Sequence, residues 1–368
     1  MHTVSLNKDN RYINVLFFLL LVMLCSCTER KQEKLVPLPH SFVLDEAKDS
    51  IWDFPSMIDV TDVVPLETTE ESYLYKIDKI EEYAGALYLL DKRAGGVFVF
   101  SLDGKFKHRI GAKGIGPGQY SNVRDFTIDR KNNRIIILSN TDVSQVYIYD
   151  LEGTFINRQE ISRSMLWNIE SLPTGGFVCS SNHLTYTEGD NAFLLFLFDE
   201  DFCVQKKQAP VFSQQILSPM FVSRPFQVTE TGAYYLDNFT GDIYTIDSTA
   251  IEKYAAVKFE NPMPMEFFIS TQLFMKHQRD YDYIMEFALL DDRMLVAYVC
   301  SGNYHVAVVS LEDYGISKAR FSGTLPPMFA GEDKTMLSSF NVLEYSSVFS
   351  TDRFTEDDNM VIVRYRWR

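Results

Sequence analysis

The sequence predicts an all-β fold, and more specifically a six-bladed β-propeller built of four-stranded blades. Three observations lead to this prediction: an aromatic content of 14% that includes 20 Tyr and 28 Phe, short β-rich runs separated by turn residues, and the return of this pattern at a nearly constant interval. Aromatic and β-branched side chains pack well on a pleated surface. A repeat of about 40–50 residues with four short strands is typical of a propeller blade, because one blade cannot bury both of its faces alone.

The first repeat is the segment LYLLDKRAGGVFVFSLDGKFKHRIG, residues 87–111. It is interpreted as three strands joined by turns at Asp91–Gly96 and Asp103–Gly104, because Asp and Gly favour tight turns. The same plan returns four times, beginning at Ile135, Phe177, Ala233 and Met294. The chain therefore contains five copies of one three-stranded meander.

The spacing of these copies is nearly regular. The middle strand of the meander ends at Ser101, Asp150, Asp199, Asp247 and Ser310. By subtraction, the intervals are 49, 49, 48 and 63 residues. The long fourth interval contains PMPMEFFISTQLFMKHQRD, residues 262–280, whose composition favours a short helix inserted between two repeats.

The remaining segments complete the predicted ring. Each copy is preceded by a further apolar run, such as VRDFTID at 123–129, which supplies the innermost strand. The 58 residues after Ser310 (368 − 310 = 58) hold a sixth blade that ends in NMVIVRYRW at 359–367. The segment MIDVTDVVPLET, residues 57–68, alternates apolar and polar side chains. We expect it to be the strand that closes the last blade, because closure removes a free sheet edge.

The N-terminus reads as a targeting signal. Basic residues precede the apolar run VLFFLLLVML at 15–24, which is long enough for the core of a signal peptide and short for a membrane-spanning helix. We expect residues 1–26 to be a signal peptide that is removed. The run ends in LCSC, which resembles the bacterial lipobox and predicts lipidation of Cys27. An uncleaved anchor and an ordinary secretory signal are the alternatives.

A tether is expected between this cysteine and the propeller. Residues 27–56 are largely polar, contain Pro37 and Pro39, and show no sustained period. The propeller itself is predicted to span residues 57–368. Within the tether, Asp49-Ser50-Ile51 resembles a bacterial glycosylation tripeptide, which makes Ser50 a candidate glycosylation site.

The glycine-rich stretch GAKGIGPGQY, residues 111–120, is interpreted as a chain connection and not as a phosphate loop. A phosphate loop needs a following helix whose first amide groups point at the anion. The residues that follow here read as strand, turn and strand. Glycine instead supplies the positive φ angles and close backbone approach of a sharp connection between the first two blades.

This stretch and its surroundings also carry a family resemblance. GAKGIGPGQYSNVRDFTID, followed by IIILSN and VYIYDLEG, resembles the NHL-type propeller repeat. The lipobox, VVPLETTEESYLYKIDKI at 63–80 and the terminal EDDNMVIVRYRW resemble six-bladed β-propeller lipoproteins of gut Bacteroidota. The resemblance covers roughly residues 57–368 and implies the fold. Its motifs are structural, so it implies no particular activity.

The resemblance also bears on location. Surface-exported lipoproteins of the Bacteroidota resemble one another in an acidic run after the lipidated cysteine, whereas this chain has TERKQEK at 28–34, with both signs of charge. An outer-membrane lipoprotein facing the periplasm is therefore favoured over one on the cell surface. Acyl chains on Cys27 would hold the protein on the membrane.

Candidate binding residues are polar side chains that come just after the second strand of a blade. They are Asp91, Asn140, Asn182, Asp237 and Asn303. Gathered around the axis, they would form a polar, acidic rim suited to a cation, a sugar or a basic peptide. The alternative is that Asp and Asn occupy these places because they fit turns and cap their own backbone.

Composition and motifs favour recognition over turnover. A formal net charge of −15 disfavours nucleic acid as a partner. We find no C-x-x-C pair, no histidine set at metal spacing and no G-x-S-x-G, and therefore expect no cofactor, no metal and no assigned catalytic residue. A Ca²⁺ ion in the central funnel stays open, although no motif supports it.

The sequence therefore favours a lipid-anchored binding or scaffolding module at the cell envelope, with an envelope protein or a glycan as partner. The alternative is a propeller hydrolase or lyase acting on a polysaccharide or a lactone. The central channel distinguishes the two, because an enzyme should show two or more carboxylates, or a histidine set, converging on one point.

Overall fold

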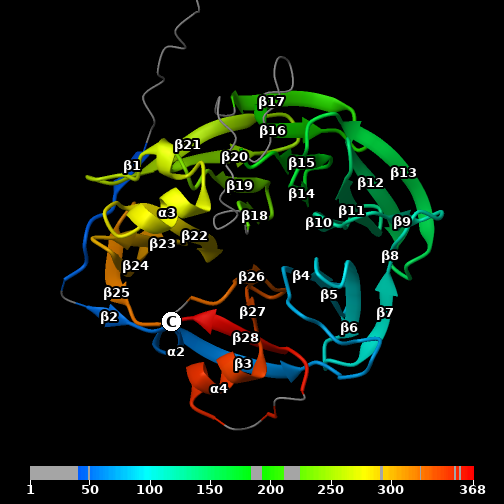
Figure 1. Ribbon diagram of the computed structural model, residues 1–368, viewed down its shortest axis with the longest axis horizontal. Helices are drawn as coiled ribbons and strands as arrows, with labels where there is room; N and C mark the ends of the chain where they lie inside the picture. The colour runs from blue at the N-terminus through cyan, green and yellow to red at the C-terminus, as the bar shows by residue number, and fades with distance from the viewer. Residues whose placement is uncertain are drawn as a thin grey trace, which may run out of the picture. The chain divides into compact units, whose positions relative to one another are not determined.

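The computed structural model describes residues 40–48, 50–183, 193–210, 224–290, 293–323, 325–351, 354–355 and 358–368, all within the unit His40–Arg368. Their strands form six blades around a central axis, with the first strand of each blade nearest the axis (Figure 1). Each blade has four antiparallel strands, and two blades carry an additional outer strand. The predicted six-bladed β-propeller is confirmed.

The strands of each blade run in order from the axis outwards. Blades 1 to 3 consist of β4 (Lys79–Tyr83), β5 (Ala86–Asp91), β6 (Gly96–Ser101) and β7 (Phe106–Ile110); β10 (Asp125–Asp129), β11 (Arg134–Asn140), β12 (Ser144–Asp150) and β13 (Phe155–Ser162); and β14 (Asn168–Ser171), β15 (Phe177–Ser180), β16 (Phe193–Phe198) and β17 (Val204–Pro210). Blades 4 to 6 consist of β18 (Phe226–Val228), β19 (Ala233–Leu236), β20 (Asp242–Ile246) and β21 (Ile251–Lys258); β22 (Tyr283–Leu290), β23 (Arg293–Cys300), β24 (Asn303–Ser310) and β25 (Ile316–Phe321); and β26 (Phe329–Ala330), β27 (Met336–Phe340), β28 (Val361–Trp367) and β3 (Ile58–Pro65).

The core lies between neighbouring blades. Tyr88 and Val99 of blade 1 share one buried cluster with Phe126 and Ile135 of blade 2. All six residues of β5 are buried, because its two faces pack against different blades. This double burial explains why the second and third strands read as continuous apolar runs, since no face of them meets water.

The ring closes as the sequence predicts. β3 pairs antiparallel with β28 from Ile58 opposite Trp367 to Pro65 opposite Val361. The first propeller segment of the chain thus becomes the outer strand of the last blade. An early strand and the last strand of the chain are thus held in one sheet, which joins the last blade to the start of the first.

The folded unit begins earlier than predicted. β1 (His40–Val43) runs parallel to β21, and β2 (Ile51–Trp52) runs parallel to β25, so both extend the outer edges of their blades. Phe42 and Leu44 are buried between blades 4 and 5. Residues 40–48 and 50–56, expected to belong to the tether, are therefore part of the fold, because their widely spaced apolar side chains cover the outer strands. The predicted signal peptide, Cys27 and residues 27–39 lie outside the described residues.

The helices of the structure are short. The helix predicted within 262–280 is confirmed as η3 (Met265–Phe267) and α3 (Thr271–His277). Two others were not predicted: α2 (Phe54–Met57), and α4 (Val342–Phe349) in the connection between β27 and β28. Among the described residues, no helix is both long enough and apolar enough to cross a membrane.

The glycine-rich stretch is a chain connection, as interpreted. β8 (Ala112–Lys113) and β9 (Gln119–Tyr120) form a small parallel ladder between blades 1 and 2, and strand β10 follows instead of a helix. Gly111 has a φ of +66°, and a Cβ atom there would lie 2.5 Å from the ring of Tyr120. Only glycine meets both demands without a shift of its surroundings.

Candidate functional site

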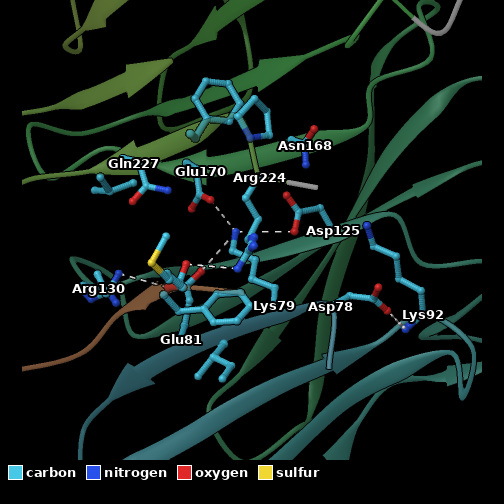
Figure 2. Close-up of a pocket in the computed structure, with 17 residues that line it drawn as sticks. Asp78, Lys79, Glu81, Lys92, Asp125, Arg130, Asn168, Glu170, Arg224 and Gln227 are labelled. Atoms are coloured by element: carbon cyan, nitrogen blue, oxygen red, sulfur yellow. Dashed lines mark hydrogen bonds and ion pairs between the residues drawn. The ribbon is translucent and has the colours of Figure 1, made fainter. Parts of the chain in front are cut away.

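A small polar cavity of about 100 Å³ lies among the innermost strands of the ring (Figure 2). Its walls come from β4, β10, β14, β18 and β26, from residues that directly precede or follow some of these strands, and from Lys92 in the connection between β5 and β6. The ionisable side chains in its lining are Asp78, Lys79, Glu81, Lys92, Asp125, Arg130, Glu170 and Arg224. This central pocket contains four acidic and four basic groups, although the chain as a whole carries a net charge of −15.

Lys79 occupies the centre of this group. Its ammonium nitrogen lies 2.6 Å from Glu170 Oε1, 3.5 Å from Asp125 Oδ1 and 3.6 Å from Glu81 Oε1. It also donates a hydrogen bond of 2.6 Å to the carbonyl oxygen of Phe126. Figure 2 shows the carboxylates converging on the lysine from three directions. The carboxylates at the centre of the pocket therefore converge on a cation that the chain itself supplies.

Burial and charge shift the ionisation of this cluster in opposite directions. Burial by itself would lower the pKa of Lys79, but attraction to Asp125, Glu170 and Glu81 outweighs it and holds that pKa above its usual value. For Glu170, burial raises the pKa to about 8, against the opposing effect of Lys79. The ammonium is thus charged at neutral pH, whereas Glu170 retains much of its proton.

The two arginines of the pocket also have carboxylate partners. Arg130 lies 3.2 Å from Glu81 Oε2, which links the exposed end of the pocket to the central cluster. Arg224 pairs with Glu286 and donates a hydrogen bond of 3.1 Å to the carbonyl oxygen of Met328. Three of the four basic groups in the lining are thus neutralised within the protein.

Lys92 is the exception. It lies in the connection between β5 and β6, is exposed to solvent, and its side chain extends along the pocket towards Asp125 (Figure 2). No hydrogen bond or ion pair of its ammonium occurs within the part of the chain that the structure describes. The part of the side chain that lies along the pocket is partly desolvated, and this desolvation lowers the pKa of Lys92, against attraction to Asp125 and Asp78. Lys92 is therefore a cation at the mouth of the pocket whose ammonium has no carboxylate partner among the described residues.

The five predicted rim residues lie at corresponding places in their blades: Asp91 and Asn140 end second strands, Asn182 and Asp237 follow them, and Asn303 begins a third strand. Within the described part of the chain, no hydrogen bond or ion pair joins any two of the five. Asp91, Asn140, Asn182 and Asp237 are buried, and Asn303 is half-buried. Each forms hydrogen bonds with residues near it. Asp91 accepts from the backbone N–H groups of Tyr75 and Ala94, and the Asn140 amide donates to the Leu166 carbonyl and accepts from the Ser144 hydroxyl. Asn182 is hydrogen-bonded to Asn168 and Ser180, Asp237 to His183 and Thr240, and Asn303 to Arg320. These contacts match the alternative in which Asp and Asn stabilise turns. A binding role for them stays a prediction.

The central cluster was missed at the sequence level, although a signal for it exists. Lys79, Asp125 and Glu170 occupy the innermost strands of three successive blades, and their spacings are 46 and 45 residues (125 − 79 and 170 − 125). A charged residue that returns at nearly the blade period on successive innermost strands indicates side chains that face the axis. Within the described residues, no group of three or more His, Cys, Asp or Glu side chains is arranged to hold a metal ion.

Comparisons with other proteins extend these observations. The family model described as Domain of unknown function (DUF4934) matches residues 42–366. A crystal structure from Bacteroides fragilis, of a protein named provisionally as exported, covers 89% of this chain and 99% of its own at 17% identity, with a TM-score of 0.70. A member of the DUF4221 family from Bacteroides vulgatus covers 84% of this chain and 98% of its own at 12% identity, with a TM-score of 0.57. At these identities the likeness concerns the fold. No curated protein matched the chain.

Proposed function

The chain belongs to the family described as Domain of unknown function (DUF4934), and on that premise we propose that it is a binding module whose partner is recognised at the mouth of the central pocket. One observation carries the proposal: the charges inside the channel satisfy one another, while Lys92 alone among the four basic lining groups has no partner. A pocket whose central charges neutralise one another suits recognition better than turnover.

The partner is expected to present an anionic or hydroxyl-rich group to Lys92. An ammonium group forms charge-assisted hydrogen bonds that are shorter and stronger than neutral ones. The carboxylate of a protein chain and the acidic or hydroxyl groups of a glycan both meet this requirement. An envelope protein or a glycan therefore remains the partner class, and a basic peptide is disfavoured at this mouth.

We further propose that the protein acts at the cell envelope through a lipid on Cys27. The apolar run at 15–24 followed by LCSC supports this location. The similar protein from Bacteroides fragilis, whose name places it among exported proteins, is consistent with it. Orientation towards the periplasm remains the favoured arrangement.

A second candidate function, hydrolysis or elimination on a polysaccharide or lactone, draws on Glu170. A carboxyl group whose pKa is about 8 can donate a proton at neutral pH, as a general acid must. The carboxylates do converge on one point, which was the criterion for an enzyme. That point, however, is occupied by the ammonium of Lys79, which would compete with a reacting atom in the adjoining cavity for the same carboxylates.

The experiment compares three forms of the mature protein: wild type, Lys92→Met, and the matched control Lys113→Met, which removes an exposed lysine outside the pocket. Each is immobilised and exposed to protein and glycan fractions of envelope extracts, and retained species are identified by mass spectrometry. We expect a partner that wild type and the Lys113 variant retain and the Lys92 variant loses. Equal retention by all three would contradict recognition at the mouth. Breakdown of a polysaccharide or lactone that Glu170→Gln abolishes would establish the second candidate instead.

A further inference from the structure

A second surface with the character of a binding site lies beside blade 1, in the segment that links β3 to β4. Residues 73–77 of this segment alternate between exposure and burial. Leu74 and Ile77 are buried, with exposed fractions of 2% and 1%. Tyr73 and Tyr75 are 49% and 54% exposed, which is unusual for large aromatic side chains. The aliphatic side chains of this segment are thus packed into the core, whereas the two tyrosine rings are exposed to solvent.

The backbone that carries these rings is firmly held. Asp91 Oδ2 accepts hydrogen bonds from the backbone N–H groups of Tyr75 and Lys76, at 2.7 and 3.2 Å. The Asn359 side chain accepts one from the N–H of Leu74 at 3.2 Å. Both anchoring side chains are buried. A partner would therefore meet rings whose backbone is already ordered, which lowers the entropic cost of binding.

The two rings form one edge-to-face unit. Their centroids are 5.6 Å apart and their planes are perpendicular. The guanidinium of Arg93 stacks over the Tyr75 ring at 4.4 Å from its centroid, which limits the rotation of that ring. Below them lies an open groove of about 760 Å³, also bordered by Glu70, Glu71, Phe106 and Lys107. This tyrosine groove shares no lining residue with the central pocket.

The mixture of groups favours a carbohydrate over a protein surface. The groove contains six ionisable side chains of types Glu, Arg, Lys and His beside four aromatic rings. The core of a protein interface is depleted of such charges. A pyranose ring presents an apolar C–H face, which packs on a tyrosine ring, and an edge of hydroxyl groups, which carboxylates and guanidinium groups can bond. Rigid tyrosines supply a large amphipathic contact area at low entropic cost.

We propose that the tyrosine groove binds a carbohydrate chain, with Tyr73 and Tyr75 as the stacking platform and Glu70 and Glu71 as acceptors for its hydroxyl groups. Asp91, one of the predicted rim residues, then acts as a positioning residue, because it holds the backbone beneath the platform. The assignment is independent of the central pocket and holds whether or not Lys92 recognises a partner.

The test uses saturation-transfer NMR and calorimetry on the full-length mature protein with four defined probes: cellohexaose, maltohexaose, chitohexaose and a hexameric mannuronate. The variant is Tyr73→Ala/Tyr75→Ala. The matched control is Tyr304→Ala, which removes a tyrosine of equal exposure, 53%, on β24. We expect at least one probe to bind wild type and the control equally, and the double variant to lose about tenfold or more in affinity.

Three results would overturn the assignment. The first is that none of the four probes binds wild type at millimolar concentration. The second is that a probe binds wild type and the double variant with equal affinity. The third is that a purified protein partner, and no probe, depends on the two tyrosines. Circular dichroism and thermal unfolding of the double variant establish that a lost affinity is not a lost fold, since both rings are largely exposed in the native state.

Discussion

Replacement of the central lysine tests the electrostatic account of the channel most directly. Lys79→Met keeps the length and apolar stem of the side chain and removes only its charge and hydrogen-bond donors. Glu81, Asp125 and Glu170 would then remain together at the axis with no cation between them. Their side chains have exposed fractions of only 9%, 5% and 13%, so water cannot take over the role of the ammonium.

The distances set the scale of the effect. At an effective dielectric constant of about 20, the contacts of 3.5 Å with Asp125 and 3.6 Å with Glu81 contribute about 5 kcal/mol each of gross attraction. The contact of 2.6 Å with Glu170 contributes about 6 kcal/mol only in those molecules in which that carboxyl is ionised. Desolvation of these charges and repulsion among the carboxylates offset most of this sum. Removal of one member of a buried ion cluster typically costs about 3–5 kcal/mol, and we expect a loss of unfolding free energy in that range.

The assay is equilibrium unfolding in urea at pH 7, followed by tyrosine and tryptophan fluorescence. Lys131→Met is the matched control, because Lys131 pairs with Glu200 at the surface, where the side chains are 64% and 44% exposed. An exposed pair contributes about 0–1 kcal/mol, so the control should change little. The Lys79 penalty should also shrink as the pH falls, because uncompensated buried carboxylates bind protons.

Equal stability of the two lysine variants would refute this reasoning. It would mean that water enters the channel and solvates the carboxylates, or that the ammonium contributes no more than a surface charge. A penalty that is unchanged between pH 5 and pH 7 would be equally damaging, because protonation of the remaining acids must relieve part of their repulsion.

Four further predictions concern the same cluster, the connection between blades, the N-terminal strands and the anchor. Burial raises the Glu170 pKa from its ordinary 4.5 to about 8, so the bound proton stabilises the fold at low pH, and this contribution is lost as the pH rises through 8. Between pH 4.5 and pH 8, the unfolding free energy of wild type should fall, relative to that of Glu170→Gln, by up to about 1.4 kcal/mol per pH unit. A difference between the urea midpoints of the two proteins that stays constant over this range would exclude the shift. Gly111→Ala should lower unfolding free energy by about 2–4 kcal/mol, more than Gly85→Ala, which has a similar positive φ but open space around it; similar losses would show that the steric contact is unimportant. A chain that begins at residue 57 should unfold several degrees below one that begins at residue 40, because it lacks β1 and β2, whereas a mere tether would leave the thermal midpoint unchanged. Cys27→Ala should move the protein from the detergent to the aqueous phase in Triton X-114 partitioning, and an unaltered distribution would argue against lipidation there.

Local patterns in the sequence were enough to predict the propeller. The alternation of apolar runs with Asp and Gly turns marks each meander. The alternation of apolar and polar side chains at 57–68 marks that segment as the additional strand that completes the last blade. Such signals are local, since strand and turn preferences depend on near neighbours. The boundary at residue 57 came too late because β1 and β2 are very short, and their pairing depends on outer strands more than 200 residues away.

The sequence by itself determined the class of the fold, the number of blades, the closing strand and the inserted helix, because each follows from residue spacing along one stretch of chain. Only the tertiary structure decided which charged side chains matter. Lys79, Asp125 and Glu170 follow one another at intervals of about 45 residues. Closure of the ring places carboxylate oxygens of Asp125 and Glu170 3.5 and 2.6 Å from the ammonium nitrogen of Lys79. The same closure left Lys92 without a partner and made Asp91 a backbone anchor, because burial and pairing of a charge depend on every blade that faces the axis.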